Sequence, residues 1–416
     1  MILETYLKQN NTTFKQVHLA SGIPQTTVRS IDKRDLDKWS IEYFEAIGKT
    51  IGKDKFEVIK ELENLRSALE NQVAPNEKKI AGRYNLENRR YIGNKNKLLS
   101  WIEELLLNHV SGDSFFDVFG GTGVVTKKIL PNYNKFILND FLFSNNTIFK
   151  AFFGDEKFDS SKINDYKNKF QKIESNHIDD DYFVDNYGNK FFSNQDARII
   201  GEIRTQIEVN SELNEREKSI LIASLIYSTD KIANTVGHYD AYRKNIDIKN
   251  RFVFELINPI DISNKKIDIF RKDANQLVRE VKTDIAFIDP PYNSRQYSRF
   301  YHVLEGLAKW NKPDLSGVAM KPPVENMSDY SKTVAPIIFD DLIKNLNAKY
   351  IVVTYNNTYT SKSSSSKNKI THEEILESLN SVGETRVFEK PFQFFNAGKT
   401  ELNGHKEFVF ITEVKK

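Results

Sequence analysis

The run Asp289-Pro290-Pro291-Tyr292 points most directly to chemistry, and it follows an apolar segment, 284–288, that we expect to be a strand. An exocyclic amine on a purine is a poor nucleophile because its lone pair is delocalised into the ring. The carboxylate of Asp289 and the carbonyl of Pro290 could accept its two hydrogens and draw the nitrogen toward tetrahedral geometry. The prolines would hold that carbonyl rigidly. Tyr292 would stack on a base that has left its duplex.

A second chemical signal lies upstream, where the expected strand 114–119 runs into a glycine loop, 120–123. Glycines at such a point let the backbone approach a nucleotide-like ligand closely. Asp140 follows the next expected strand, 135–138, and an acid there can accept both ribose hydroxyls of an adenosine. Thr126 stands where the dinucleotide fingerprint has its third glycine. The loop alone fits a nicotinamide enzyme as well as an S-adenosylmethionine enzyme, so the tetrapeptide decides between them.

These motifs need elements to position them, and strand-like and helix-like segments alternate from residue 85 onward. Such alternation predicts an α/β fold with a mostly parallel sheet. Residues 155–262 interrupt the rhythm with sequence rich in Asp, Asn and Tyr, so we interpret them as an insertion. The strands that we expect are 114–119, 135–138, 285–288, 350–354 and 407–412.

The first 66 residues predict a small all-α domain, followed by a polar linker at 67–84. Two helical patterns flank Gly22-Ile23-Pro24, which indicates a helix-turn-helix, and the segment resembles bacterial and phage repressor-type domains. Because acidic and basic residues nearly balance here, a helical docking or dimerisation module is the alternative. If this domain binds DNA, the residues that we expect to read base edges are Gln25, Thr26, Thr27 and Arg29.

Composition excludes several classes of site. The chain has 416 residues, a formal net charge of +3 and no cysteine, which excludes disulfides, zinc–thiolate sites, iron–sulfur clusters and thiol nucleophiles. The histidines are scattered without ligand spacing, so we expect no metal. No apolar stretch approaches the roughly 20 residues of a membrane span and no signal peptide is evident. We therefore expect a soluble cytoplasmic protein without a membrane partner.

From Arg89 onward the chain resembles the alpha-group, Dam-like DNA adenine-N6 methyltransferases, because its motifs follow that family's order. The segment 90–95 comes first, then the glycine loop, then the tetrapeptide. The resemblance implies a Rossmann-like, S-adenosylmethionine-dependent methyltransferase domain over 85–416, with target recognition in the insertion 155–262. It also implies a cofactor site made by Tyr91, Lys95, Asp117, Phe119, Gly121, Gly123, Asp140, Asp273 and Asp289.

Contacts with double-stranded DNA are expected in three places. Residues 230–244 mix Tyr, His, Arg and Lys around a glycine, which suits a loop that contacts phosphates and opens a base pair, although an ordinary surface loop is the alternative. The basic run from Lys78 to Lys97 is a solvated face or a further phosphate contact. The extension from Asn293 onward resembles a subgroup associated with restriction systems, which implies a cognate restriction endonuclease in the same system, without direct contact. The expected DNA contacts are His238, Tyr239, Tyr242, Arg243 and Arg295.

We therefore expect an enzyme that transfers the methyl group of S-adenosylmethionine to the N6 amine of an adenine flipped out of DNA. Two alternatives remain open. A cytosine-N4 methyltransferase uses the same geometry on another exocyclic amine, although that group more often carries Ser at the position of Asp289. A DNA-binding regulator would bind an operator through the first 66 residues and sense the cofactor with the larger domain.

Overall fold

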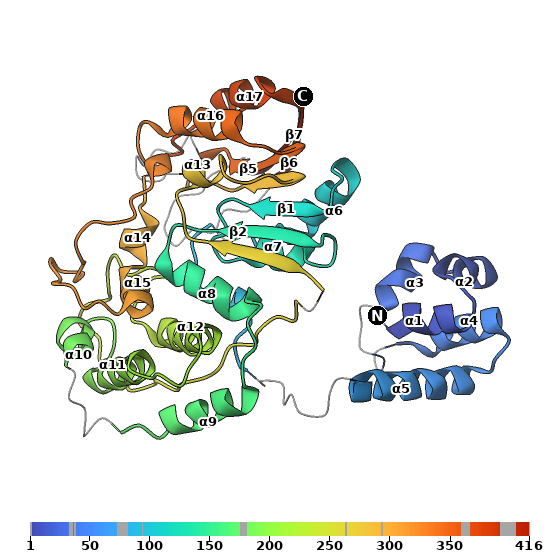
Figure 1. The fold of residues 1–416 in the computed structure, drawn as a ribbon, viewed down its shortest axis with the longest axis horizontal. Helices are drawn as coiled ribbons and strands as arrows, with labels where there is room; N and C mark the ends of the chain where they lie inside the picture. Colours follow the sequence, from blue (N-terminus) through green and yellow to red (C-terminus); the bar gives the residue numbers. More distant parts are fainter. Residues whose placement is uncertain are drawn as a thin grey trace. The chain divides into compact units, whose positions relative to one another are not determined.

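A computed structural model describes residues 2–32, 36, 39–72, 82–93, 95–174, 181–262, 264–292, 294–358, 367–391 and 405–415. The chain divides into two compact units, Met1–Lys78 and Lys79–Lys416, each with its own hydrophobic core (Figure 1). We call them unit 1 and unit 2. None of the helices in the described ranges has both the length and the apolarity needed to cross a membrane.

Unit 1 is built from helices packed around an apolar core. They are α1 (Ile2–Gln9), α2 (Phe14–Ser21), α3 (Gln25–Ile31), α4 (Ile41–Ile51) and α5 (Lys55–Gln72). Gly22 ends α2 with a φ of 76°, a conformation that glycine adopts without the penalty of a Cβ atom, and Pro24 precedes α3. Val28 and Ile31 lie on the apolar side of α3 and are buried in the core of unit 1. The turn between α2 and α3 therefore lies where the sequence predicted it.

The expected linker at 67–84 is wrong at both ends. At its start, α5 continues to Gln72, since residues 67–72 include good helix formers. At its end, Tyr84 is buried in the core of unit 2 and pairs with Ile257 in an isolated β-bridge. The described residues inside this stretch thus belong to the two units themselves, and 73–81 lie outside the described residues.

Unit 2 contains a seven-stranded sheet in the order β3-β2-β1-β4-β5-β7-β6. Its strands are β1 (Ser114–Asp117), β2 (Lys135–Asn139), β3 (Lys266–Phe270), β4 (Ile285–Ile288), β5 (Tyr350–Asn356), β6 (Gly383–Pro391) and β7 (Lys406–Val414). The strands from β3 to β5 pair in parallel, and β7 lies antiparallel between β5 and β6. The predicted α/β fold with a mostly parallel sheet is confirmed.

The sequence did not predict β3 and β6, and both lie at the edges of the sheet. β3 alternates apolar with charged side chains, and only Ile267 of its five residues is buried. β6 is mostly exposed and carries Glu, Arg and Lys. Edge strands of this kind lack the continuous apolar run that marks a central parallel strand, so their sequence resembles a loop.

Helices cover both faces of the sheet. Phe115 and Phe116 are consecutive residues of β1 whose side chains point to opposite faces, and each belongs to a different hydrophobic cluster. The helices around the first cluster include α6 (Leu99–His109), α7 (Val124–Ile129), α8 (Phe143–Phe153) and α15 (His302–Lys309). Those around the second are α13 (Ala274–Leu277), α16 (Ala335–Asn345) and α17 (His372–Asn380). The result is a doubly wound layer (Figure 1).

The chain runs from β1 outward to β2 and β3, and then returns to β4 and β5 on the other side of β1. The strand order therefore reverses between β1 and β4. In open α/β sheets this reversal leaves a crevice at the carboxyl ends of the two strands, and ligands bind there. Both sequence motifs follow these two strands, so the fold brings them to the same edge.

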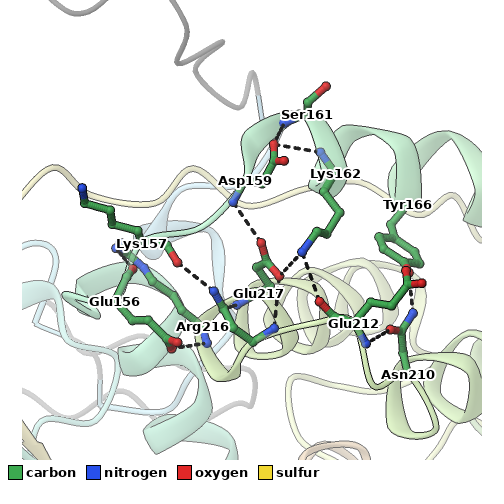
Figure 2. A network of polar contacts seen from close by, with 11 residues as sticks. Glu156, Lys157, Asp159, Ser161, Lys162, Tyr166, Asn210, Glu212, Arg216 and Glu217 are labelled. Carbon is green, nitrogen blue, oxygen red and sulfur yellow. Dashed lines mark hydrogen bonds and ion pairs between the residues drawn. The ribbon is translucent and has the colours of Figure 1, made fainter.

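The predicted insertion lies between α8 and β3 and is largely helical, with α9 (Ser160–Phe170), α10 (Tyr182–Tyr187), α11 (Asn194–Glu208) and α12 (Glu215–Ile232). It does not form a separate unit, because α12 packs on α8 and shares its hydrophobic cluster (Figure 1). Glu217 joins α9 to α12: its carboxylate accepts from the backbone nitrogen of Asp159 at 2.9 Å and from Lys162 Nζ at 2.8 Å (Figure 2).

Candidate functional site

A cavity opens at the carboxyl ends of β1 and β4, where the strand order reverses, with an empty volume of about 1100 Å³ that includes its open side. Every residue of the tetrapeptide lines it. Of the nine predicted cofactor residues, all but Gly123 line it as well: Tyr91, Lys95, Asp117, Phe119, Gly121, Asp140, Asp273 and Asp289. The structure thus brings together residues from five separate segments of the sequence.

Gly123 is the exception: it does not line the cavity, and its role in binding the cofactor stays a prediction. It precedes α7 with a φ of 75°, and an added Cβ would lie 3.1 Å from Phe149 and 3.2 Å from Phe153. The residue is therefore a glycine because the backbone is left-handed there and because aromatic rings pack against it. Gly123 therefore allows the loop to pack closely against Phe149 and Phe153.

Gly121 is the glycine of the loop that faces the cavity. Its φ is 55°, and an added Cβ would find no protein atom closer than Tyr91 Cε1 at 3.7 Å. A side chain at this position would therefore occupy space in the cavity. The nitrogen of Gly121 donates to Asp140 Oδ2 at 2.9 Å, and the nitrogen of Leu142 donates to Asp140 Oδ1 at 2.9 Å. These bonds fix the Asp140 carboxylate beside the loop.

The carboxylate of Asp289 is held by one of its oxygens. Oδ1 accepts from Thr354 Oγ1 at 2.8 Å, accepts from the hydroxyl of Tyr292, and forms an ion pair with Lys95 Nζ at 2.8 Å. Within the described part of the chain, no hydrogen bond reaches Oδ2 or the carbonyl of Pro290. The side chain is therefore fixed in orientation, and two acceptors at the cavity remain available for a pair of donor hydrogens.

Tyr292 contributes to this arrangement more than the sequence suggested. Its ring is 9% exposed, it meets Tyr355 edge-on at 4.9 Å, and Lys95 Nζ lies 4.7 Å from its centroid. Lys95 also donates to the Tyr292 hydroxyl, which in turn donates to Asp289. The tyrosine thus orients the carboxylate, and its stacking on a base stays a prediction.

Acidic side chains surround the cavity, and burial perturbs two of them. Burial raises the pKa of Asp117 to about 7; a hydrogen bond from Thr126 Oγ1 at 2.8 Å opposes the rise, and the nearby charges of Asp289 and Asp140 add to it. Burial also raises the pKa of Asp140. Such groups favour a positively charged ligand, because a cation beside them would stabilise their ionised forms.

An aromatic platform supports the segment that carries Tyr91. The ring of Tyr91 stacks on Tyr301 with centroids 4.8 Å apart and on Tyr297 with centroids 5.2 Å apart. The nitrogen of Ile92 donates to the Tyr301 hydroxyl at 2.9 Å, and the Tyr297 hydroxyl donates to the Ile92 carbonyl at 3.2 Å. The guanidinium of Arg89 covers both Tyr91 and Tyr301.

Sequence reasoning missed Thr354 and the platform role of Tyr301. Thr354 belongs to β5, the neighbour of β4, and the carboxyl ends of adjacent parallel strands meet at one edge. A polar residue at the end of the predicted strand 350–354 was therefore the available signal. No comparable signal identified Tyr301, because its stacking on Tyr91 depends on how α15 packs.

One predicted DNA contact is wrong. Tyr239 has no exposed surface: its hydroxyl donates to Asp230 Oδ1 at 3.0 Å and its ring packs on Phe191. A tyrosine is stable in the core when its hydroxyl has a hydrogen-bond acceptor there, and Asp230 provides that acceptor. His238 is half-buried, and its ring stacks on the Phe300 ring with centroids 4.5 Å apart. The guanidinium carbon of Arg295 lies 5.8 Å from the centroid of the same Phe300 ring. Tyr242 is half-buried and Arg243 is exposed.

The basic run divides between buried and exposed residues, and its described exposed members are Arg83 and Lys97. Arg89 and Lys95 are buried, and Arg90 forms an ion pair with Asp230. Lys78 and Lys79 lie outside the described residues. In unit 1, Thr26 and Arg29 are exposed on α3, whereas Gln25 and Thr27 are half-buried. Within the described ranges, no group of three or more His, Asp or Glu side chains could hold a metal ion.

Comparison with known proteins adds to the geometry. Residues 91–375 match the family model described as D12 class N6 adenine-specific DNA methyltransferase. The chain is 33% identical over 288 residues to modification methylase LlaI of Lactococcus lactis subsp. lactis, which covers 64% of this chain and 46% of that protein. It is 34% identical over 286 residues to modification methylase StsI of Streptococcus sanguinis, covering 64% of this chain and 44% of that one.

A third relative matches over nearly its whole length. Type II methyltransferase M.NlaIII of Neisseria lactamica is 28% identical over 354 residues, which cover 78% of this chain and 98% of that protein. The chain thus spans about half the length of LlaI and StsI and almost the full length of M.NlaIII.

Proposed function

The chain belongs to the D12 class N6 adenine-specific DNA methyltransferase family, and on that premise we propose that it transfers the methyl group of S-adenosylmethionine to the N6 amine of an adenine in double-stranded DNA. Membership confirms the family that the order of the motifs indicated. One observation supports the proposed reaction above the others: Asp289 Oδ2 and the Pro290 carbonyl are two open acceptors at the cavity that the glycine loop also lines.

The residues of the cavity fit the proposed cofactor. Gly121 leaves space that any side chain would fill, and Asp140 and Asp273 offer carboxylates for hydroxyl and amine donors. Asp117 is a buried acid on the wall, which suits a ligand with positive charge. When bound, S-adenosylmethionine would supply a methyl group on a positively charged sulfur.

The remaining chemistry belongs to the protein's own groups. Asp289 Oδ2 and the Pro290 carbonyl would accept the two hydrogens of the adenine amine and so direct its lone pair toward the methyl donor. The same carboxylate would stabilise the positive charge that develops on the nitrogen. Lys95, Tyr292 and Thr354 would hold Asp289 in this orientation. Alignment of this kind can supply on the order of 7–11 kcal/mol of the barrier.

We propose that the target strand meets the surface around His238, Tyr242, Arg243 and Arg295. Arg295 precedes Gln296, which lines the cavity, so this surface adjoins the opening. Arg243 is exposed and available for phosphate, while His238 presents a ring that Phe300 already orients. The relatives named above are modification methylases and a type II methyltransferase, which supports a restriction–modification setting with a cognate endonuclease.

The test removes the carboxylate on which the reaction depends. In the Asp289→Ala variant we expect the rate of tritiated methyl transfer to DNA to fall by at least about 100-fold, because one of two acceptors for the amine is lost. Asp268→Ala is the matched control, since this half-buried acid lies on the edge strand β3 and does not line the cavity. Digestion of the product DNA should give N6-methyladenine by mass spectrometry.

Two results would contradict the proposal. One is a methyl-transfer rate for Asp289→Ala within a few-fold of the parent, which would show that the carboxylate takes no part. The other is N4-methylcytosine as the product, which would assign the same geometry to the other exocyclic amine.

A further inference from the structure

A second pocket in unit 2 lies outside the cavity described above. Its empty volume is about 770 Å³, including its open side, and it is lined by Arg83, Tyr84, Asn88, Arg90, Tyr227, Asp230 and Lys231. We call it the Arg83 pocket. No part of the proposed reaction uses it.

The pocket has a rigid floor. Tyr84 and Tyr227 are buried, with ring centroids 5.8 Å apart, and the Tyr227 hydroxyl donates to the Leu86 carbonyl at 3.0 Å. The backbone nitrogens of Arg83 and Tyr84 both donate to the Leu256 carbonyl, at 2.8 Å and 3.1 Å. The core of unit 2 therefore fixes the backbone that carries Arg83 and Tyr84 at the opening.

The acids near this pocket already have cationic partners. Asp230 pairs with Arg90, Glu87 pairs with Lys127 at 2.6 Å, and Glu255 pairs with Lys167 at 2.8 Å. Each of these three carboxylates is therefore locally neutralised, so none of them offsets a further positive charge at the opening.

Two cations and an amide remain at the opening. Arg83 and Lys231 are exposed, and within the described part of the chain neither side chain forms an ion pair or a hydrogen bond. Asn88 is fixed because its Oδ1 accepts from the backbone nitrogen of Asn85 at 2.7 Å, which leaves its amide hydrogens free of partners among the described residues. The one carboxylate that lines the pocket, Asp230, already binds Arg90 and the Tyr239 hydroxyl. The donors and positive charge of Arg83, Lys231 and the Asn88 amide therefore remain available, a combination that suits a phosphate group.

The chain links this pocket directly to the reaction site. Arg90 lines the Arg83 pocket and the next residue, Tyr91, lines the cavity. Neighbouring Cα atoms are about 3.8 Å apart. Each DNA strand carries one phosphate for about every 3.4 Å of helix axis, so a strand that delivers a base to the cavity carries phosphates on both sides of that base that can reach the adjoining pocket.

We propose that the Arg83 pocket holds a backbone phosphate of the DNA substrate, contacted by Arg83, Lys231 and the Asn88 amide. The proposal rests on the proposed function, since it assigns a further contact to the same substrate. A phosphate contact fixes the position of the strand without reading its sequence. It also makes binding depend on salt, because each neutralised phosphate releases condensed counterions.

The experiment measures the affinity of the full-length protein for duplex DNA from 50 to 200 mM KCl. We expect Arg83→Ala and Lys231→Ala each to reduce the slope of log affinity against log salt by about 1. Over this fourfold range, the parent should lose about 3.5-fold more affinity than either variant. Arg83→Lys should keep the slope of the parent, because it keeps the charge.

Lys135→Ala is the matched control. Lys135 is an exposed lysine at the amino end of β2, at the opposite edge of the sheet from the cavity, so its loss should leave the slope unchanged. Binding of S-adenosylmethionine should be the same in all variants, which shows that each is folded.

Slopes for Arg83→Ala and Lys231→Ala equal to that of the parent would overturn the phosphate site and leave the proposed reaction intact. Failure of the parent to bind duplex DNA at any salt concentration would overturn both.

Discussion

At the scale of single residues, Asp289 shows how contacts from distant segments fix the orientation of a carboxylate. Lys95, Tyr292 and Thr354 all bind the same oxygen, so together they fix the plane of the carboxylate and leave its second oxygen without these partners. Thr354 and Lys95 come from segments far from Asp289 in the sequence. A fixed acceptor needs no reorientation when a substrate arrives, and this is the main way in which preorganised groups lower a barrier.

Asp117 gives a prediction about pH. Its pKa, raised to about 7 chiefly by burial, makes the carboxyl mostly protonated at pH 6 and mostly ionised at pH 8. A cationic ligand on the cavity wall favours the ionised form. The affinity for S-adenosylmethionine should therefore rise between pH 6 and pH 8, by at most about tenfold per unit below the pKa.

Isothermal titration calorimetry at pH 6, 7 and 8 would check this dependence. Asp117→Asn should flatten the profile and weaken binding most at pH 8, where the parent carries the charge. Asp268→Asn, on the edge strand β3, should keep the profile of the parent. A variant Asp117→Asn with the unchanged profile would assign the pH dependence to another group.

At the scale of elements, the contact between α9 and α12 depends on Glu217. Its side chain is 2% exposed, and it accepts from Lys162 and from the backbone of Asp159 and Asn214 (Figure 2). Burial by itself would raise the pKa of Glu217, but these hydrogen bonds more than offset that effect and lower it. The ionised form is thus the one that the folded state prefers.

This lowered pKa sets the direction of a stability effect. Glu217 contributes stability above its unfolded pKa, and the contribution is lost as pH falls through the lower, folded value. At pH 7, Glu217→Gln should therefore reduce the free energy of unfolding by about 1–3 kcal/mol, because hydrogen bonds to a charged acceptor are lost. The reduction should shrink at acidic pH, where the parent is protonated too.

Urea unfolding followed by circular dichroism at pH 7 and at acidic pH measures both quantities. Glu212→Gln is the matched control, since Lys162 binds the backbone carbonyl of Glu212 and its side chain is exposed (Figure 2). An equal loss of unfolding free energy for the two variants at pH 7 would show that Glu217 contributes no more to stability than an exposed glutamate.

At the scale of the whole molecule, the chain combines a helical unit with a doubly wound unit, and each has a separate core. Unit 1 presents Thr26 and Arg29 at the surface of α3, where a helix-turn-helix would place its contacts with DNA. The family match begins at residue 91, so unit 1 lies outside it. DNA binding by unit 1 accordingly stays a prediction.

Arg29→Ala in the full-length protein tests that prediction. If α3 contacts DNA, affinity for duplex DNA should fall about tenfold, while the methyl-transfer rate at saturating DNA stays unchanged, since α3 takes no part in the reaction. The measurements are fluorescence anisotropy and tritiated methyl transfer. Lys49→Ala removes the same charge from an exposed position on α4. Equal affinities for both variants would favour the docking or dimerisation alternative.

The sequence by itself determined the features that depend on local backbone and chain order. Alternation of apolar segments predicted the mostly parallel sheet, and the glycine loop and tetrapeptide lie at the ends of β1 and β4 as expected. These predictions succeed because the conformational freedom of glycine and the restricted backbone of proline are properties of the residues themselves. The edge strands β3 and β6 escaped prediction, since an edge needs no continuous apolar run.

Only the tertiary structure decided which polar side chains are exposed and which of them contact one another. A sequence of Tyr, His, Arg and Lys cannot show that Tyr239 is buried while Arg243 is exposed, because burial depends on what packs against each residue. Thr354 meets Asp289 because β5 pairs with β4, and that pairing is a long-range contact. Burial and long-range pairing are properties of the packed chain as a whole, so no local pattern encodes them.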